Sequence, residues 1–140
     1  METEKRPFND FSYEKFLSEE KLMGSKCRDC QSLYVPPRAI CPKCFGSNME
    51  WVRMKGQGEL AAFTCIFIGP PFMAAQGFNR KNPYCTGVVR LEEGAKVDAR
   101  IVGVDALHPE TINVSRPMKV KFLHLDEGDQ RQTYLAFEPA

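Results

Sequence analysis

The stretch that decides the fold reads Cys27-Arg-Asp-Cys30, then ten residues, then Cys41-Pro-Lys-Cys44. Each Cys-x-x-Cys pair presents two sulfurs on the same side of a tight turn, so four thiolates can converge on one tetrahedral ion. Zinc is the usual ion for four sulfur ligands in a small domain. We therefore predict one structural zinc, bound by Cys27, Cys30, Cys41 and Cys44.

The two turns that clamp the metal are named here the first knuckle (residues 27–32) and the second knuckle (residues 41–46). Pro42 and Gly46 suit the second knuckle, because glycine supplies the positive φ that other residues resist. Gln31 stands at the corresponding place in the first knuckle, where glycine is more usual. We expect the first knuckle to have the less ideal geometry.

Other chemistries compete for the same four cysteines, namely two disulfides, a four-sulfur iron site and a thiol redox centre. The chain begins Met-Glu-Thr-Glu-Lys-Arg without an apolar secretory segment, so we expect it in the reducing cytoplasm, where disulfides are rare. A redox Cys-x-x-Cys would sit in a βαβ setting, which the sequence lacks. A zinc with four protein ligands is closed, so it would support folding and not catalysis.

Composition indicates an ordinary globular protein, with 43% hydrophobic and 26% charged residues in 140. No run approaches the roughly 20 apolar residues that span a bilayer. The net charge is only +1, but residues 21–55 carry seven basic and two acidic side chains. Their cluster of Arg38, Lys43, Arg53 and Lys55 could meet CoA phosphates or an acidic partner, or it could simply be solvated.

The segment before the cysteines predicts a helix over residues 8–22. Asp10 is a plausible N-cap, and Phe11, Phe16 and Leu17 form an uneven apolar stripe. Such a stripe needs a cover, and we expect this helix to pack on its own protein more than on a partner.

The rest of the chain predicts short strands with turns between them. The ribbon contributes strands at residues 22–26 and 33–35, and the later strands cover residues 59–68, 84–91, 96–104, 118–125 and 133–137. In residues 84–91 alternation places Cys85, Val89 and Leu91 on one face and Tyr84, Thr86, Val88 and Arg90 on the other. In residues 96–104 it points Val97, Ala99 and Ile101 one way. The fold class is therefore mainly β with an N-terminal helix: a rubredoxin-like zinc ribbon followed by a five-stranded OB-fold barrel. We divide the chain into residues 1–22 (helical segment), 23–55 (ribbon) and 56–140 (barrel).

The ordered set of motifs resembles the DUF35 family over nearly the full length. These motifs are the N-terminal helix, the two cysteine pairs, Pro36-Pro37-Arg38 between them, Trp51, Gly58, Pro83-Tyr84 and Leu91-Glu-Glu-Gly94. The resemblance implies a zinc-ribbon and OB-fold protein of acyl-CoA metabolism. Such proteins accompany thiolase-like enzymes, or hydratases and aldolases of steroid side-chain breakdown, and the partner holds the catalytic residues.

This resemblance implies a non-catalytic zinc-binding subunit in a hetero-oligomer with a thiolase-like enzyme. Its role would be assembly, stabilisation or channelling of a CoA thioester at the interface. Acetoacetyl-CoA, steroid side chains and aromatic acyl-CoAs such as benzoylsuccinyl-CoA are substrates served by relatives. We expect contact with neither a membrane nor nucleic acid.

The long connection at residues 69–83 is the most informative stretch outside the metal site. It exceeds the usual hairpin length and carries apolar groups that a solvated loop would avoid. We predict that Phe72, Met73 and Phe78 dock on the partner or border an acyl chain, while Arg80 and Lys81 meet CoA phosphates. The alternative is that Phe72 and Phe78 fold back to plug the barrel's open end.

The residue types outside the metal site do not suggest catalysis. A thiolase needs a reactive cysteine with acid–base groups, but Cys65 and Cys85 both fall in predicted strands and are interpreted as core. We expect no serine, cysteine or carboxylate constellation around His108 or His124. The alternative function is binding of single-stranded nucleic acid, for which Tyr84, Arg90, Lys96 and Arg100 make a thin set of surface groups.

Overall fold

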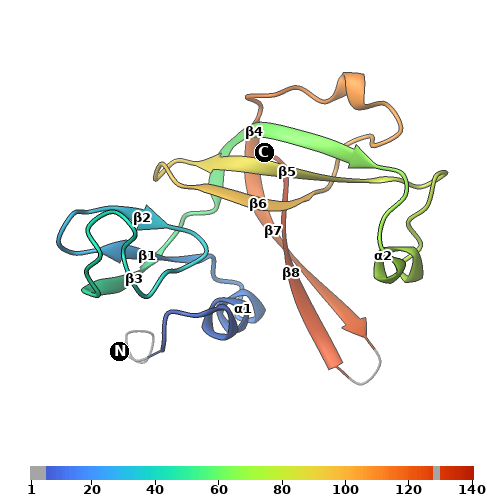
Figure 1. The fold of residues 1–140 in the computed structure, drawn as a ribbon. Helices are drawn as coiled ribbons and strands as arrows, with labels where there is room; N and C mark the ends of the chain where they lie inside the picture. Colours follow the sequence, from blue (N-terminus) through green and yellow to red (C-terminus); the bar gives the residue numbers. More distant parts are fainter. Residues whose placement is uncertain (1–5, 128–129) are drawn as a thin grey trace.

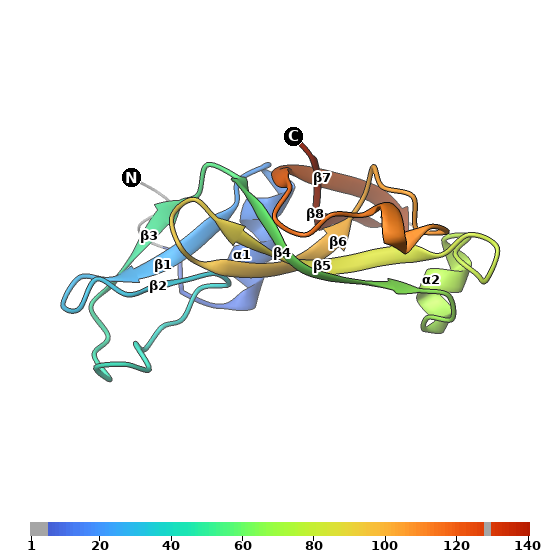
Figure 2. The ribbon, with the colours of Figure 1, turned by 90° about the horizontal axis from the view of Figure 1, so that it is seen from above.

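The computed structural model describes residues 6–127 and 130–140, in which a ribbon, a helix and a barrel are joined (Figure 1). Helix α1 spans Asp10–Ser18, and the ribbon contains β1 (Met23–Cys27), β2 (Leu33–Tyr34) and β3 (Met49–Arg53). The barrel contains β4 (Gln57–Ile66), β5 (Tyr84–Leu91), β6 (Lys96–Ile101), β7 (Pro117–Glu127) and β8 (Gln130–Pro139). A short helix, α2 (Pro71–Ala75), and a 3₁₀ turn (Pro109–Thr111) complete the fold. The ribbon and α2 lie at opposite ends of the molecule in both views (Figures 1 and 2).

The five barrel strands close in the order β4-β5-β6-β8-β7, with the β6–β8 pair parallel and the other pairs antiparallel. This closure confirms the predicted five-stranded barrel. The start of β4 needs two glycines: Gly56 has φ +80°, and a Cβ on Gly58 would collide with the Arg90 carbonyl oxygen. A bulge between Leu60 and Ala62 adds further coiling to the strand.

The barrel core follows the predicted strand faces. Cys85, Val89 and Leu91 are each at most 2% exposed, and Val97 and Ile101 are 3% exposed. Tyr84, predicted to face the other way from Cys85, is also buried. The reason is the connection after β4, whose Phe78 ring packs at a tilt against the Tyr84 ring, with 5.3 Å between centroids.

Helix α1 differs in three respects from the predicted helix over residues 8–22. Its N-cap is Asn9, not Asp10, because the Asn9 side chain accepts a hydrogen bond from the Ser12 backbone N–H at 2.9 Å. It ends at Ser18, and Glu20 then adopts φ +61°, which an α-helix does not allow. Phe11, assigned to the apolar stripe, is instead 74% exposed.

The remaining apolar residues of α1 join the ribbon to the barrel. Phe16 is fully buried against the Trp51 ring of β3, with centroids 4.9 Å apart. Leu17 belongs to the barrel's hydrophobic cluster, as do Leu22 and Met54 at the two ends of the ribbon. Ribbon and barrel therefore share one continuous core, and the division at residues 55 and 56 stays a prediction.

Candidate functional site

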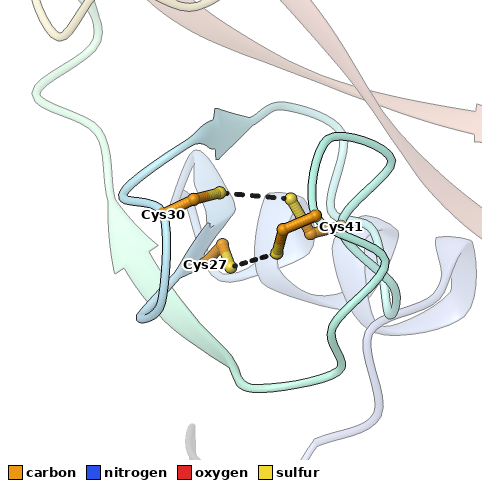
Figure 3. Close-up of side chains that lie close together, drawn as sticks. Cys27, Cys30 and Cys41 are labelled. Carbon is orange, nitrogen blue, oxygen red and sulfur yellow. Dashed lines mark hydrogen bonds between the residues drawn. The ribbon is translucent and has the colours of Figure 1, made fainter.

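The four cysteines of the ribbon form one compact cluster of sulfur atoms. All four sulfurs lie within 4.8 Å of one another, although they come from two turns. Figure 3 shows the sulfurs of Cys27, Cys30 and Cys41 directed toward one another, with Cys30 and Cys41 joined at 3.4 Å. Cys27 and Cys44 are 3.5 Å apart.

These distances fit a metal site better than disulfides. A disulfide holds its sulfurs at about 2.05 Å, whereas ligands at about 2.3 Å from a tetrahedral ion are separated by roughly 3.8 Å. All six cysteines of the chain are free. The donor set, four sulfurs from two knuckles, is therefore positioned for one tetrahedral ion.

The two knuckles share one backbone pattern. In the first, the Gln31 N–H donates to the Cys27 carbonyl at 2.8 Å, and in the second the Phe45 N–H donates to the Cys41 carbonyl at 2.7 Å. Gln31 and Phe45 also share a left-handed φ, +67° and +62°. The expectation that Gly46 supplies the positive φ was wrong, because Phe45 is the structural equivalent of Gln31. Gly46 instead lies close to the four sulfurs, and a Cβ on this residue would come within 3.3 Å of Asp29 Oδ2.

Two side chains of the ribbon contact the sulfurs, and the sequence analysis missed both. The Tyr34 hydroxyl lies 3.3 Å from Cys41 Sγ and lowers the pKa of that thiol to about 6. Ser32 Oγ lies 3.3 Å from Cys30 Sγ, and this hydrogen bond lowers the pKa of Cys30. Both contacts favour the thiolate, which is the form that binds metal. The signal for Ser32 was its place in the knuckle, two residues after Cys30.

The fourth thiol has the opposite tendency. The Gly46 backbone N–H favours the thiolate of Cys44, but the hydrogen bond with Cys27, the loss of hydration among the sulfurs and the contacts with Cys41 and Cys30 outweigh it and raise the pKa to about 12. Four negative sulfurs this close together repel one another, so the cluster without a cation keeps a proton. A bound divalent cation would remove that repulsion.

The apolar residues of the loop after β4 divide between buried and exposed ones, and docking on a partner or an acyl chain stays a prediction. Met73 is 3% exposed, and Phe78 packs on Tyr84, so these two fold back on the barrel. Phe72 stays 56% exposed, on the same connection as the exposed Phe67 and Ile68. Arg80 and Lys81 are exposed as well.

A groove of about 510 Å³ runs beside this loop. Phe72 and Met73 line one side, Val35 of the ribbon lines another, and Arg100 lies within it. Arg100 is held near the rings of Phe78 and Tyr134, at 5.5 and 5.6 Å, and burial lowers its pKa. The groove therefore joins an apolar wall to a partly desolvated cation.

The predicted basic cluster is divided in the structure. Arg53 and Lys55 line a second groove of about 420 Å³ at the junction of ribbon and barrel. Arg38 lies over the Tyr34 ring, 5.8 Å from its centroid, and Lys43 is exposed on the second knuckle.

Both histidines have carboxylate partners, contrary to the sequence analysis. His124 Nε2 lies 2.9 Å from Glu20 and its Nδ1 lies 2.8 Å from Thr133 Oγ1. His108 Nδ1 lies 2.7 Å from Asp105 in an exposed loop. The sequence could not reveal the first group, because folding joins residues 104 positions apart.

Glu20, His124 and Thr133 are linked as in the catalytic triad of a hydrolase, but their surroundings differ from those of a triad. His124 and Thr133 are directly paired in the β7–β8 ladder. The backbone at Thr133 is therefore regular strand, unlike the exposed turn that presents a nucleophile beside oxyanion donors. We interpret these contacts as holding the end of α1 against the hairpin.

Cys65 and Cys85 face each other across β4 and β5. Burial raises the pKa of Cys85 to about 12, with a smaller effect from the neighbouring Cys65, and a thiol with so high a pKa is a poor nucleophile. None of the helices in residues 6–127 and 130–140 has the length and apolar character that crossing a lipid bilayer requires.

The surface proposed for nucleic-acid stacking is largely engaged within the protein. Tyr84 is 8% exposed, Arg90 pairs with Glu59 at 3.0 Å, and Arg100 lies between two rings. Lys96 alone of the four named residues is both exposed and outside these contacts.

Comparisons with known proteins agree with this architecture. Residues 15–50 match the ChsH2 rubredoxin-like zinc ribbon domain, and residues 51–123 match the ChsH2 C-terminal OB-fold domain. A DUF35 domain-containing scaffold protein of Pyrococcus furiosus is 32% identical over 115 residues, which cover 82% of this chain and 78% of the relative. The benzoylsuccinyl-CoA thiolase subunit BbsA of Thauera aromatica is 33% identical over 82 residues, 59% of this chain and 52% of BbsA.

A solved structure shares the same fold. The Ltp2-ChsH2(DUF35) aldolase superposes with a TM-score of 0.74 at 24% identity, covering 94% of each chain. Both domains thus match in sequence, and their arrangement recurs in a structure. The chain belongs to the DUF35 family, with the zinc ribbon and OB-fold of ChsH2-type proteins.

Proposed function

We propose that this chain is a non-catalytic subunit that binds one structural zinc and assembles with a thiolase-like, acyl-CoA-processing enzyme. The observation that carries this proposal is family membership together with the roles that the names of relatives state: a scaffold protein, and a subunit of a benzoylsuccinyl-CoA thiolase. The enzyme would form or cleave a carbon–carbon bond next to a thioester carbonyl. Acetoacetyl-CoA, steroid side-chain and aromatic acyl-CoAs are the substrates to test.

The proposed metal is zinc because four thiolates in a closed tetrahedral cluster are its usual structural site. Cys27 and Cys41 are fully buried, so the metal would form the centre of the ribbon. Iron is the alternative ion for four sulfurs. Metal analysis of the purified chain separates the two.

The absence of catalysis in this chain is supported by its chemistry. A four-cysteine site leaves no position for substrate on the metal. Cys85, with its raised pKa, lacks the low-pKa thiolate of a thiolase nucleophile. In this proposal, catalysis comes from the partner.

The α2 end of the barrel is the surface we propose for the partner or for the CoA thioester. Phe67, Ile68 and Phe72 expose 39, 69 and 56% of their area there, an apolar group of the kind that marks interfaces. Arg80 and Lys81 lie on the same connection and are suited to phosphate oxygens.

The test is to tag the chain in its own cells, purify its complex and assay thiolysis of the candidate acyl-CoAs. We expect activity in the complex and none in the isolated chain. Phe72→Ser should release the partner with little change in stability, whereas Phe78→Ser should destabilise the fold because Phe78 packs on Tyr84. Phe11→Ser is the matched control on a distant exposed phenylalanine. Thiolysis by the isolated chain would overturn the proposal.

A further inference from the structure

The two knuckles share a backbone but differ in the side chains they present. Lys26 precedes the first cysteine of the first knuckle, and Ile40 precedes the first cysteine of the second knuckle. The left-handed residue after the second cysteine is Gln31 in one and Phe45 in the other. Ile40 and Phe45 expose 59 and 81% of their area. The second knuckle thus presents two large apolar groups where the first presents polar ones.

Phe45 is unfavourable for the isolated chain on two counts. Its φ of +62° lies in the left-handed region, which bulky residues rarely adopt and glycine adopts without steric cost. Its ring also remains in water, since Phe45 belongs to neither hydrophobic cluster of the described residues. A residue that costs stability in two ways points to a role outside the fold.

Two cations and one carboxylate lie near this tip. Arg38 and Lys43 are exposed, and among the side chains that the structure describes neither forms an ion pair with a carboxylate. Asp29 is the nearby acid, but it belongs to the first knuckle and accepts a hydrogen bond from Asn48 at 3.3 Å. The second knuckle therefore combines an apolar tip with two exposed cations that lack a carboxylate partner among the described side chains.

We propose that the second knuckle is an anchor that inserts Phe45 and Ile40 into an apolar pocket of the partner enzyme, with carboxylates around that pocket facing Arg38 and Lys43. This inference rests on the proposed function. Aromatic side chains in desolvated pockets, surrounded by polar contacts, carry most of the binding energy at interfaces. The loop between β2 and β3, which carries this knuckle, extends away from the barrel in Figure 2. Because α2 lies at the opposite end, the anchor is a second contact region, separate from the α2 surface.

A competing role for Arg38 and Lys43 is to offset the negative charge of four thiolates around a divalent ion, which totals −2. That role predicts that Lys43→Glu releases metal. The anchor role predicts that Lys43→Glu keeps metal and loses the partner.

The test compares Phe45→Gly with Gln31→Gly in the purified complex. Both changes relieve the same backbone conformation, but only the first removes the anchor. For Phe45→Gly we expect the dissociation constant of the complex to rise by about 10-fold or more, while zinc stoichiometry is kept and the melting temperature does not fall. Gln31→Gly should leave the dissociation constant unchanged. Higher salt should weaken the wild-type complex.

Several outcomes would overturn the anchor. An unchanged dissociation constant for Phe45→Gly would do so, as would loss of zinc or a lower melting temperature in that variant, since these indicate a structural role. Self-association of the isolated chain that Phe45→Gly abolishes would make a second copy the occupant. If the wild-type chain has no enzyme partner at all, the proposed function fails. If the complex forms but Phe45→Gly does not weaken it, only the anchor fails.

Discussion

The ribbon and the barrel are stabilised by different means. The ribbon's own cluster has three buried residues, Cys27, Cys41 and Met49, and two of them are metal ligands. The other cluster has 13 buried residues, most of them on barrel strands. So small a ribbon cannot bury enough apolar surface to fold alone, and a metal supplies what is missing. The ribbon therefore relies on coordination at its own centre, whereas the barrel relies on burial in a core that Leu22, Val35 and Met54 of the ribbon region also join.

The largest expected effect comes from removing a ligand. Cys41→Ser, at a fully buried ligand, should abolish metal binding and disorder the ribbon, because structural zinc contributes about 10–16 kcal/mol in small metal domains. Amide spectra should lose dispersed signals from residues 23–53 and keep those of the barrel. Cys65→Ser, outside the metal cluster, is the control and should retain one metal. Dispersed ribbon signals in the metal-free variant would contradict the comparison.

The second-largest effect should come from truncating a buried side chain of the barrel. Phe137 is fully buried, so Phe137→Ala should lower the free energy of unfolding by about 3–5 kcal/mol, measured by urea denaturation. Phe11→Ala, at a residue 74% exposed, should change it by less than about 0.5 kcal/mol. Metal content should remain one per chain below the transition. Loss of metal ahead of barrel unfolding would show that the two regions are less distinct than we infer.

A smaller effect is expected from relieving the left-handed backbone conformation in the first knuckle. Gln31→Gly relieves a left-handed φ of +67° but loses the hydrogen bond from Gln31 Nε2 to the Arg28 carbonyl. We expect a net gain of up to about 1 kcal/mol, seen as slower transfer of metal to a chelator. Faster transfer would mean that the hydrogen bond outweighs the backbone strain.

The smallest effect concerns pH and the barrel's exposed loop. The hydrogen bond with Asp105 raises the pKa of His108, and the same bond lowers the pKa of Asp105. The stabilisation from His108 is complete below its ordinary pKa near 6.5 and is lost as pH rises through the raised value. The part from Asp105 is lost as pH falls through its lowered value. An NMR titration of Asp105→Asn should return the His108 pKa toward 6.5, and an unchanged pKa would contradict the assigned cause.

Sequence reasoning succeeded where local pattern determines structure. The cysteine spacing predicted the metal cluster, and alternation predicted the buried face of β5, because both depend on neighbours a few residues away. It was wrong on the N-cap and on the residue with positive φ at the second knuckle. Asn and Asp are both favoured N-cap residues, so the residue type alone does not decide between Asn9 and Asp10.

The errors further along the chain came from contacts between distant segments. The pairing of His124 with Glu20 and the burial of Tyr84 beneath Phe78 depend on how the barrel closes.

The most direct test of the account is native mass spectrometry of the protein isolated at normal abundance from its own cells. We predict a hetero-oligomer with an acyl-CoA-processing enzyme, with one zinc for each copy of this chain. A monomer carrying one zinc and no partner would keep the metal site and contradict the role as a subunit.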